Sequence, residues 1–128
     1  MKELIEMKII KSRLHIGEGV VEVAILRSEM LRAYMLLDML TEDVVGEVYF
    51  NDSAMHQRLC IQISEEATYI PETGCVMITN NHVACLKRFL SQCYLNPYDM
   101  KWLHEDIEVG ISQGKDVVLN VLFEDADY

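Results

Sequence analysis

Three side chains in the last quarter of the sequence have the types and the spacing to do chemistry. His104, Asp106 and Glu108 occupy alternate positions of the segment His104-Glu105-Asp106-Ile107-Glu108. On a β-strand, alternate side chains point to the same face, which would bring an imidazole and two carboxylates together. Such a group can bind a divalent cation or exchange a proton. The interpretation that we favour is a solvated outer face of a strand, because catalysis also needs a pocket.

The rest of the sequence offers no catalytic or metal-binding motif. It has no glycine-rich phosphate loop, no zinc-protease motif, no serine-hydrolase motif and no EF-hand loop. The residues that come nearest to a zinc site are Cys75, His82, Cys85 and Cys93. Cys93 would lie over two turns beyond Cys85 on one helix, so that these ligands would not converge. We therefore expect no catalytic residue, no metal and no cofactor, and an enzyme built on His104, Asp106 and Glu108 is the lesser alternative.

The cysteines and the N-terminus indicate the compartment. The four cysteines form no CxxC pair, which is typical of free and mostly buried thiols in a reducing environment. The first six residues mix charges of both signs and lack the apolar core of a signal peptide. No apolar run is long enough to span a membrane. We expect a cytoplasmic protein.

The chain is strongly acidic, and its charge is unevenly spread. The net charge is −10; residues 1–37 hold six basic and five acidic residues, and the remainder holds five basic and sixteen acidic ones. A field of this sign repels nucleic acid and anionic membranes and steers the protein toward basic partners. We expect a basic protein partner, no direct nucleic-acid binding and no membrane binding. A simpler interpretation is that the charge only keeps the protein soluble.

The elements that must position these side chains are organised around Glu18 to Thr41. Six apolar residues recur there at steps of three and four, as on one face of a helix: Val23, Leu26, Met30, Ala33, Leu37 and Leu40. We favour a single long helix over this stretch. The alternative is a strand to about Leu26 and a helix from Ser28, because the residues after Gly19 are largely β-branched and serine is a good N-cap.

The alternation of apolar residues, together with residues typical of turns between the segments, predicts the other elements. The predicted strands are 44–50, 58–64, 67–70, 75–79, 102–111 and 117–123, with an edge strand or irregular lead-in at 7–16. A second amphipathic helix begins near Thr79 and ends by Asn96-Pro97. We expect one α+β domain, residues 1–128, in which two helices pack on one face of an antiparallel or mixed sheet of about five to six strands. No internal repeat is evident.

This order of elements, the small size and the acidity are similar to those of class I type III secretion chaperones, which are dimeric effector-binding proteins. The chain departs from that family by ending after its last strand, where the family has a further helix. Small acidic immunity proteins and phage-encoded inhibitors, which dock on a basic toxin or enzyme, resemble it in size and charge. Both resemblances imply a binding protein.

We therefore expect a non-catalytic protein-binding module, most concretely an inhibitor or immunity-type protein that docks on a basic target. The candidate contacts are exposed acids and aromatics: Glu47, Tyr49, Glu65, Glu66, Tyr98, Asp99 and Trp102. The alternative is an oligomeric, secretion-chaperone-like binding protein such as a homodimer. Its interface would be formed by apolar residues that flank the stripe of the first helix: Leu31, Tyr34 and Leu36.

Overall fold

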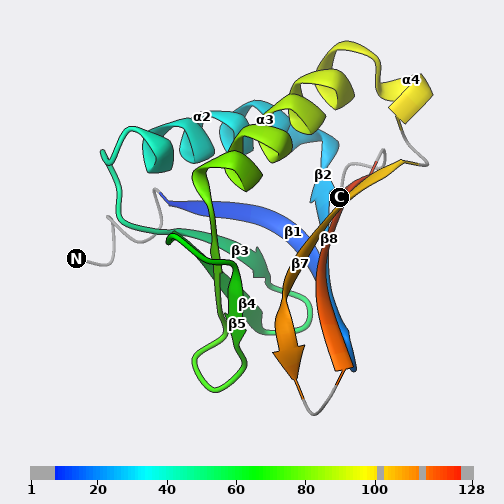
Figure 1. Cartoon of the computed structure of the whole chain (residues 1–128). Helices are drawn as coiled ribbons and strands as arrows, with labels where there is room; N and C mark the ends of the chain where they lie inside the picture. The colour runs from blue at the N-terminus through cyan, green and yellow to red at the C-terminus, as the bar shows by residue number, and fades with distance from the viewer. Residues whose placement is uncertain (1–7, 101–102, 113–114, 125–128) are drawn as a thin grey trace.

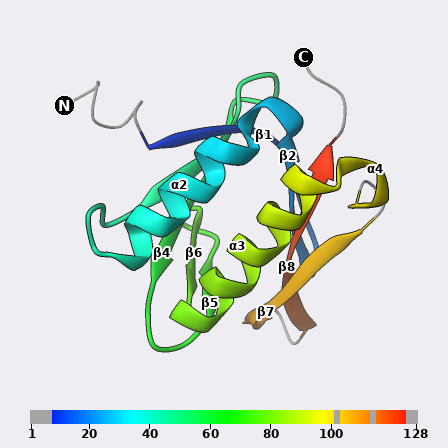
Figure 2. The ribbon, with the colours of Figure 1, turned by 90° about the horizontal axis from the view of Figure 1, so that it is seen from above.

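An eight-stranded mixed sheet, curved almost into a barrel, carries helices across one of its faces (Figures 1 and 2). The structure is a computed structural model that describes residues 8–100, 103–112 and 115–124. The strands are β1 (Ile9–Gly17), β2 (Val20–Leu26), β3 (Val48–Asp52), β4 (Gln57–Ile63), β5 (Thr68–Ile70), β6 (Cys75–Ile78), β7 (His104–Ser112) and β8 (Lys115–Glu124). The helices are η1 (Arg27–Glu29), α2 (Met30–Thr41), α3 (Asn80–Leu95) and α4 (Pro97–Met100). The order across the sheet is β5-β6-β4-β3-β1-β2-β8-β7.

The long helix predicted from Glu18 to Thr41 is wrong, and the alternative of a strand followed by a helix is confirmed. Val21, Val23 and Ile25 alternate as fully buried residues of β2. β2 pairs antiparallel with β1 and parallel with β8, so its backbone is satisfied on both sides. The helical spacing of Val23 and Leu26 with the later residues was therefore coincidental, because β-branched residues fit a strand better.

Strand β1 lies in the middle of the sheet, which corrects the prediction of an edge strand or an irregular lead-in. It pairs with β2 from Ser12 to Gly17 and with β3 from Ile9 to Lys11. Its alternation looked weak because Ser12, a polar residue, is one of the inward positions and is 6% exposed. The sheet is consequently larger than the five to six strands that we expected.

The later elements follow the predicted pattern closely. Helix α3 begins after Thr79, whose side chain accepts a hydrogen bond from the backbone N–H of His82 at 3.2 Å. In β7 and β8 the inward apolar residues are buried: Ile107, Val109, Val117, Leu119, Val121 and Phe123. The predicted strand also included Leu103 as an inward residue, and this was wrong, because β7 begins at His104 and Leu103 is 51% exposed. Strand β3, in contrast, begins only at Val48, and Val44 is an exposed residue outside it.

Helices α2 and α3 run antiparallel to each other above the inner face of the sheet, and we call the two together the helical layer (Figure 2). An ion pair of 2.7 Å joins Lys87 Nζ to Asp38 Oδ1 between them. The start of α2 is fixed to β1, because Arg32 Nε donates to the carbonyl of Ile9 at 2.8 Å. Apolar residues from both helices and from the inner face of the sheet form one core cluster. No helix in the described part of the chain is long and apolar enough to cross a membrane.

The order of elements repeats, although no repeat is visible in the sequence. Residues 9–63 and residues 68–124 each form a hairpin, a helix and a second hairpin. The two halves join through parallel pairs on both sides, β2 with β8 and β4 with β6. The two edge strands approach each other near Thr68, since a Cβ at Gly110 would lie 3.9 Å from its Oγ1. The sheet is therefore built from two interlocked halves.

Candidate functional site

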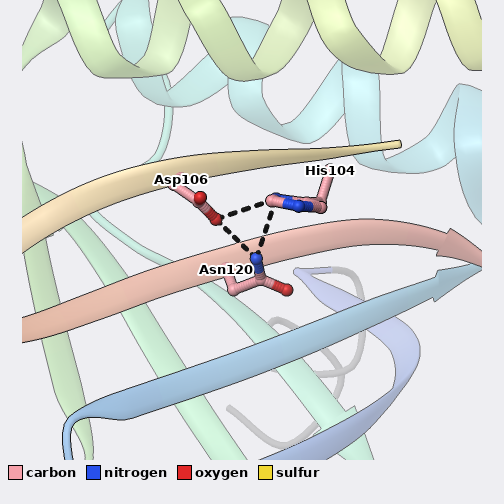
Figure 3. A network of polar contacts seen from close by, with 3 residues as sticks. All are labelled: His104, Asp106 and Asn120. Carbon is pink, nitrogen blue, oxygen red and sulfur yellow. Dashed lines mark hydrogen bonds and ion pairs between the residues drawn. The ribbon is translucent and has the colours of Figure 1, made fainter. Parts of the chain in front are cut away.

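A small polar network occupies the outer face of the β7–β8 hairpin (Figure 3). Asp106 and Asn120 are directly opposite in the antiparallel register. Asp106 Oδ1 lies 3.0 Å from His104 Nδ1 and also accepts a hydrogen bond from the side-chain amide of Asn120. The same amide nitrogen lies 3.0 Å from His104 Nδ1. The sequence predicted that His104 and Asp106 share a face, and it missed Asn120 because cross-strand register is a property of the fold.

The chemistry of this network is limited by its geometry. When Nδ1 of His104 carries a proton it donates to Asp106, and when it does not it can accept from Asn120. The side chains of His104 and Asp106 are each about half exposed, so that water competes for these bonds. Within the described residues, no three His, Cys, Asp or Glu side chains are placed to hold a metal ion, and Glu108 does not join His104 and Asp106 in such a group. The network is a set of exposed hydrogen-bonding groups.

A second polar cluster surrounds Glu47, on the outer face of β3, β4 and β6. Its carboxylate accepts hydrogen bonds from the hydroxyl of Tyr49, from Gln62 Nε2 at 3.0 Å and from the thiol of Cys60 at 3.4 Å. Cys75 is the register partner of Cys60 on the neighbouring strand. The Arg58 guanidinium lies 5.5 Å from the centre of the Tyr49 ring. Glu47 is thus held by donors from two strands.

The surroundings shift the pKa of three groups of this cluster, Glu47, Tyr49 and Cys60. The hydrogen bonds from Tyr49 and Gln62 lower the pKa of Glu47, which keeps it ionised. Burial and donation to Glu47 raise the pKa of Tyr49 to about 12. Burial, together with the neighbouring Cys75, raises the pKa of the Cys60 thiol, so the nucleophilic thiolate is disfavoured. The arrangement is suited to holding β3 on β4.

A buried carboxylate, Asp52, lies at the end of β3, in the segment Asn51-Asp52-Ser53 whose composition is typical of a turn. Asp52 is 5% exposed, and its side chain accepts hydrogen bonds from the backbone N–H of Leu14 at 2.9 Å and of Met55 at 3.2 Å. The ladder between β1 and β3 ends at Lys11 and Asn51, so Asp52 satisfies β1 where the two strands separate. Asp52 also lines a cavity of about 440 Å³ together with His15 and Glu22. Both bonds of Asp52 go to the protein backbone, which indicates a structural role.

The residues predicted to bind a partner are placed in three separate regions. Glu47 and Tyr49 bond to each other on the sheet, and Glu65 and Glu66 are exposed between β4 and β5. Tyr98 and Asp99 belong to α4, beyond the far end of α3 (Figure 1). Helix α3 has sixteen residues, and a helix rises about 1.5 Å per residue. The end of α3 that precedes α4 therefore lies roughly 24 Å from its beginning. Trp102 lies outside the described residues.

The helical layer and α4 carry a cluster of exposed large apolar side chains. Each is more than half exposed: Leu31, Met35, Tyr94, Leu95 and Tyr98. We call these five residues the apolar patch. The beginning of α2 lies beside the end of α3 (Figure 2), and Leu31 and Tyr94 line a common groove between the helices. Folded monomeric proteins rarely expose large contiguous apolar patches.

Two grooves flank the ridge of α2 that bears Leu31. The larger, of about 480 Å³, lies on the side away from α3 and is lined by Lys8, Ser28, Leu31, Arg32, Met35, Leu36, Met39 and Val45. The smaller, of about 140 Å³, lies between the helices and is lined by Met30, Leu31, Tyr34, Leu90, Ser91 and Tyr94. Of the residues predicted at an oligomer interface, Leu31 is on the ridge, Tyr34 is half-buried in the smaller groove, and Leu36 is 6% exposed in the core. The interface stays a prediction. The width of the apolar stripe singled out Leu31 and Tyr34 beside these grooves, and the sequence pattern did not indicate that α3 also lines the smaller one.

The helical layer differs in charge from the rest of the chain. Helices α2 and α3 together hold three basic residues and one acidic residue, whereas the remainder holds eight basic and twenty acidic residues. The Lys87 ammonium, 2.7 Å from Asp38, also lies 5.4 Å from the centre of the Tyr34 ring. A net charge of +2 on these helices thus stands against −12 elsewhere.

Comparison with protein-family models, with curated proteins and with solved structures finds no match for this chain.

Proposed function

We propose that this protein is a non-catalytic protein-binding module whose contact surface is the helical layer. The observation that carries the proposal is the apolar patch, five large side chains that are each more than half exposed, three of which line the two grooves: Leu31, Met35 and Tyr94. When another polypeptide chain docks, its side chains fill apolar grooves and pack against the apolar ridges beside them. The polar clusters support no competing catalytic function, because the thiol of Cys60 is held protonated and the His104 network is open to water.

The charge distribution supports a second contact, with a basic partner, on the rest of the surface. Outside the helical layer the chain carries −12, and in the β7–β8 hairpin the acids Asp106, Glu108 and Asp116 are exposed. Such a surface attracts a basic protein over a distance comparable with the Debye length. An inhibitor or immunity-type protein, which neutralises a basic target by docking on it, has this property.

The contact surface is tested by comparing what two variants of the full chain capture from native cytoplasm. The first variant combines Leu31→Asp and Tyr94→Asp, which place charges on the ridge and on α3. The control is Met55→Asp in the β3–β4 connection, where the side chain is 62% exposed and apolar but lies away from the helices. We expect the first variant to lose the captured chains that the wild type and the control retain, additional copies of this protein included. Equal capture by all three proteins would refute the proposal.

The basic partner is tested separately, by the dependence of capture on salt. Exposed charges attract each other less as ionic strength rises, whereas apolar contacts persist. We expect a basic protein to be released as salt is raised and to be retained by the Leu31→Asp, Tyr94→Asp variant. Capture that is independent of salt, or the absence of any basic protein, would contradict this second contact.

A further inference from the structure

We infer that the occupant of the apolar patch is a second copy of this chain, which makes the protein a homodimer joined through its helical layers. The inference rests on the proposed function, in that it names the chain that covers the proposed contact surface. Three properties of the helical layer support a second copy: its apolar area, its charge and its shape.

The apolar area matches that of a stable dimer. A large side chain offers roughly 150–250 Å² when it is whole, so five that are more than half exposed present on the order of 600 Å². A standard interface buries about 800 Å² on each partner, and slightly more than half of this area is apolar. The patch therefore supplies the apolar part of such an interface without any rearrangement. It also equals or exceeds the largest patch of a typical monomer, roughly 300–600 Å².

The charge of the helical layer makes it the favourable face for self-association. Two copies with a net charge of −10 repel each other, and the repulsion is smallest when the acidic parts of both point away from the contact. Helices α2 and α3 hold only one acidic residue, Asp38, and it is paired with Lys87. A basic partner would gain nothing from this face, which carries +2, whereas a second copy avoids most of its own repulsion there.

The shape of the patch is self-complementary. In an interface with two-fold symmetry, the same surface must supply both the protruding and the receiving parts. Leu31 and Met35 form a ridge one helical turn apart, and the groove of about 480 Å³ lies directly beside that ridge. Leu31 also lines the smaller groove on its other side. A two-fold axis through the helical layer can therefore set the ridge of each copy into a groove of the other.

The test is the mass of the purified full chain in solution, measured by light scattering and sedimentation over a wide range of concentrations. We expect a species of twice the chain mass that dissociates on dilution. The combined Leu31→Asp, Tyr94→Asp variant should raise the dissociation constant about a hundredfold, because each dimer would bury the new carboxylates against apolar surface. The Met55→Asp control should dimerise as the wild type does. Circular dichroism establishes that each variant is folded, and Leu95→Asp, at a position 69% exposed, replaces Tyr94→Asp if the latter perturbs α3.

The outcomes separate the inference from the proposed function. A dimer that is weakened by the patch variant and not by the control supports the second copy. A protein that is monomeric at every concentration overturns it, and if the patch variant still loses a captured partner, the occupant is a different protein and the proposed function stands. A dimer that is unaffected by the patch variant also overturns the inference, because its interface then lies elsewhere.

Discussion

Asp52 accepts two backbone hydrogen bonds at the point where β1 and β3 separate. We expect Asp52→Ala to lower the free energy of unfolding by about 2 kcal/mol, because the buried N–H of Leu14 would lose its acceptor. Asp52→Asn should also be destabilising, since its amide group would face one of the two N–H donors. Urea denaturation measures both effects. Ser53→Ala, in the exposed part of the same turn, is the control and should be neutral. An alanine variant as stable as the wild type would show that water replaces the carboxylate.

Glu47 makes stability depend on pH in a defined direction. Because hydrogen bonds lower the pKa of Glu47 in the folded protein, its ionised form stabilises the fold at neutral pH. This contribution is present above the pKa of the unfolded chain and is lost as the pH falls through the lower pKa of the folded protein. We expect Glu47→Gln to be less stable than the wild type at pH 7, and the difference to shrink in acid, when both are compared by urea denaturation. A difference that is constant with pH would contradict the role of the charge.

At the scale of residues, the sequence indicated which residues are notable better than it indicated which residues they bond to. Glu47 and Tyr49 were singled out as exposed contacts for a partner and His104 as a possible ligand; in the structure Glu47 and Tyr49 are half-buried and bonded to each other, and His104 contacts Asp106. The partners Gln62 and Asn120 come from other strands, so only the register reveals them. Asp52 was missed because Asn51-Asp52-Ser53 has the composition of a turn, although Asp52 is the buried end of β3.

At the scale of elements, the end of α2 contains a residue that the backbone does not favour. The N–H of Val44 donates to the carbonyl of Met39 at 2.9 Å, and the N–H of Asp43 donates to that of Leu40 at 3.3 Å, which is a Schellman motif. Asp43 has φ 59° at the position where glycine is preferred, and it places a negative charge at the C-terminal end of the helix dipole.

Replacing Asp43 by glycine should therefore stabilise the protein. We expect Asp43→Gly to raise the free energy of unfolding by about 0.5–1 kcal/mol. Asp43→Asn removes the charge and keeps a side chain, so it separates the electrostatic part of the gain from the backbone part. Thermal or urea denaturation of the three proteins gives the comparison, and a glycine variant that is less stable than the wild type would count against the motif.

The elements also show where the sequence pattern was ambiguous. The β7–β8 hairpin was predictable because its apolar residues alternate. Helix α3 was predictable because its apolar spacing, its cap at Thr79 and its end before Pro97 all indicate the same helix. From Val20 to Leu26 the helical spacing and the β-branched composition disagreed, and pairing with β1 and β8 decides for the strand. Such long-range pairing cannot be read from a local pattern.

At the scale of the whole molecule, the two halves should unfold together. Each half supplies strands to both joining pairs, so that neither retains a complete sheet without the other. We expect one unfolding transition, with the same midpoint by circular dichroism and by calorimetry. Asp52→Ala in the first half and Thr79→Ala in the second should lower the midpoint of that same transition. Two separate transitions, each sensitive to one variant, would mean that the halves are independent.

The pairing of β2 with β8 has a consequence for a growing chain on the ribosome. Val20 pairs with Val118, so most of the sequence must be translated before β2 acquires its second neighbour. Until then, one edge of β2 and part of the inner face of the sheet are open to other nascent chains. Slow translation between these two strands should therefore lower the yield of native protein, and a chaperone that shields exposed apolar surface on nascent chains should restore it.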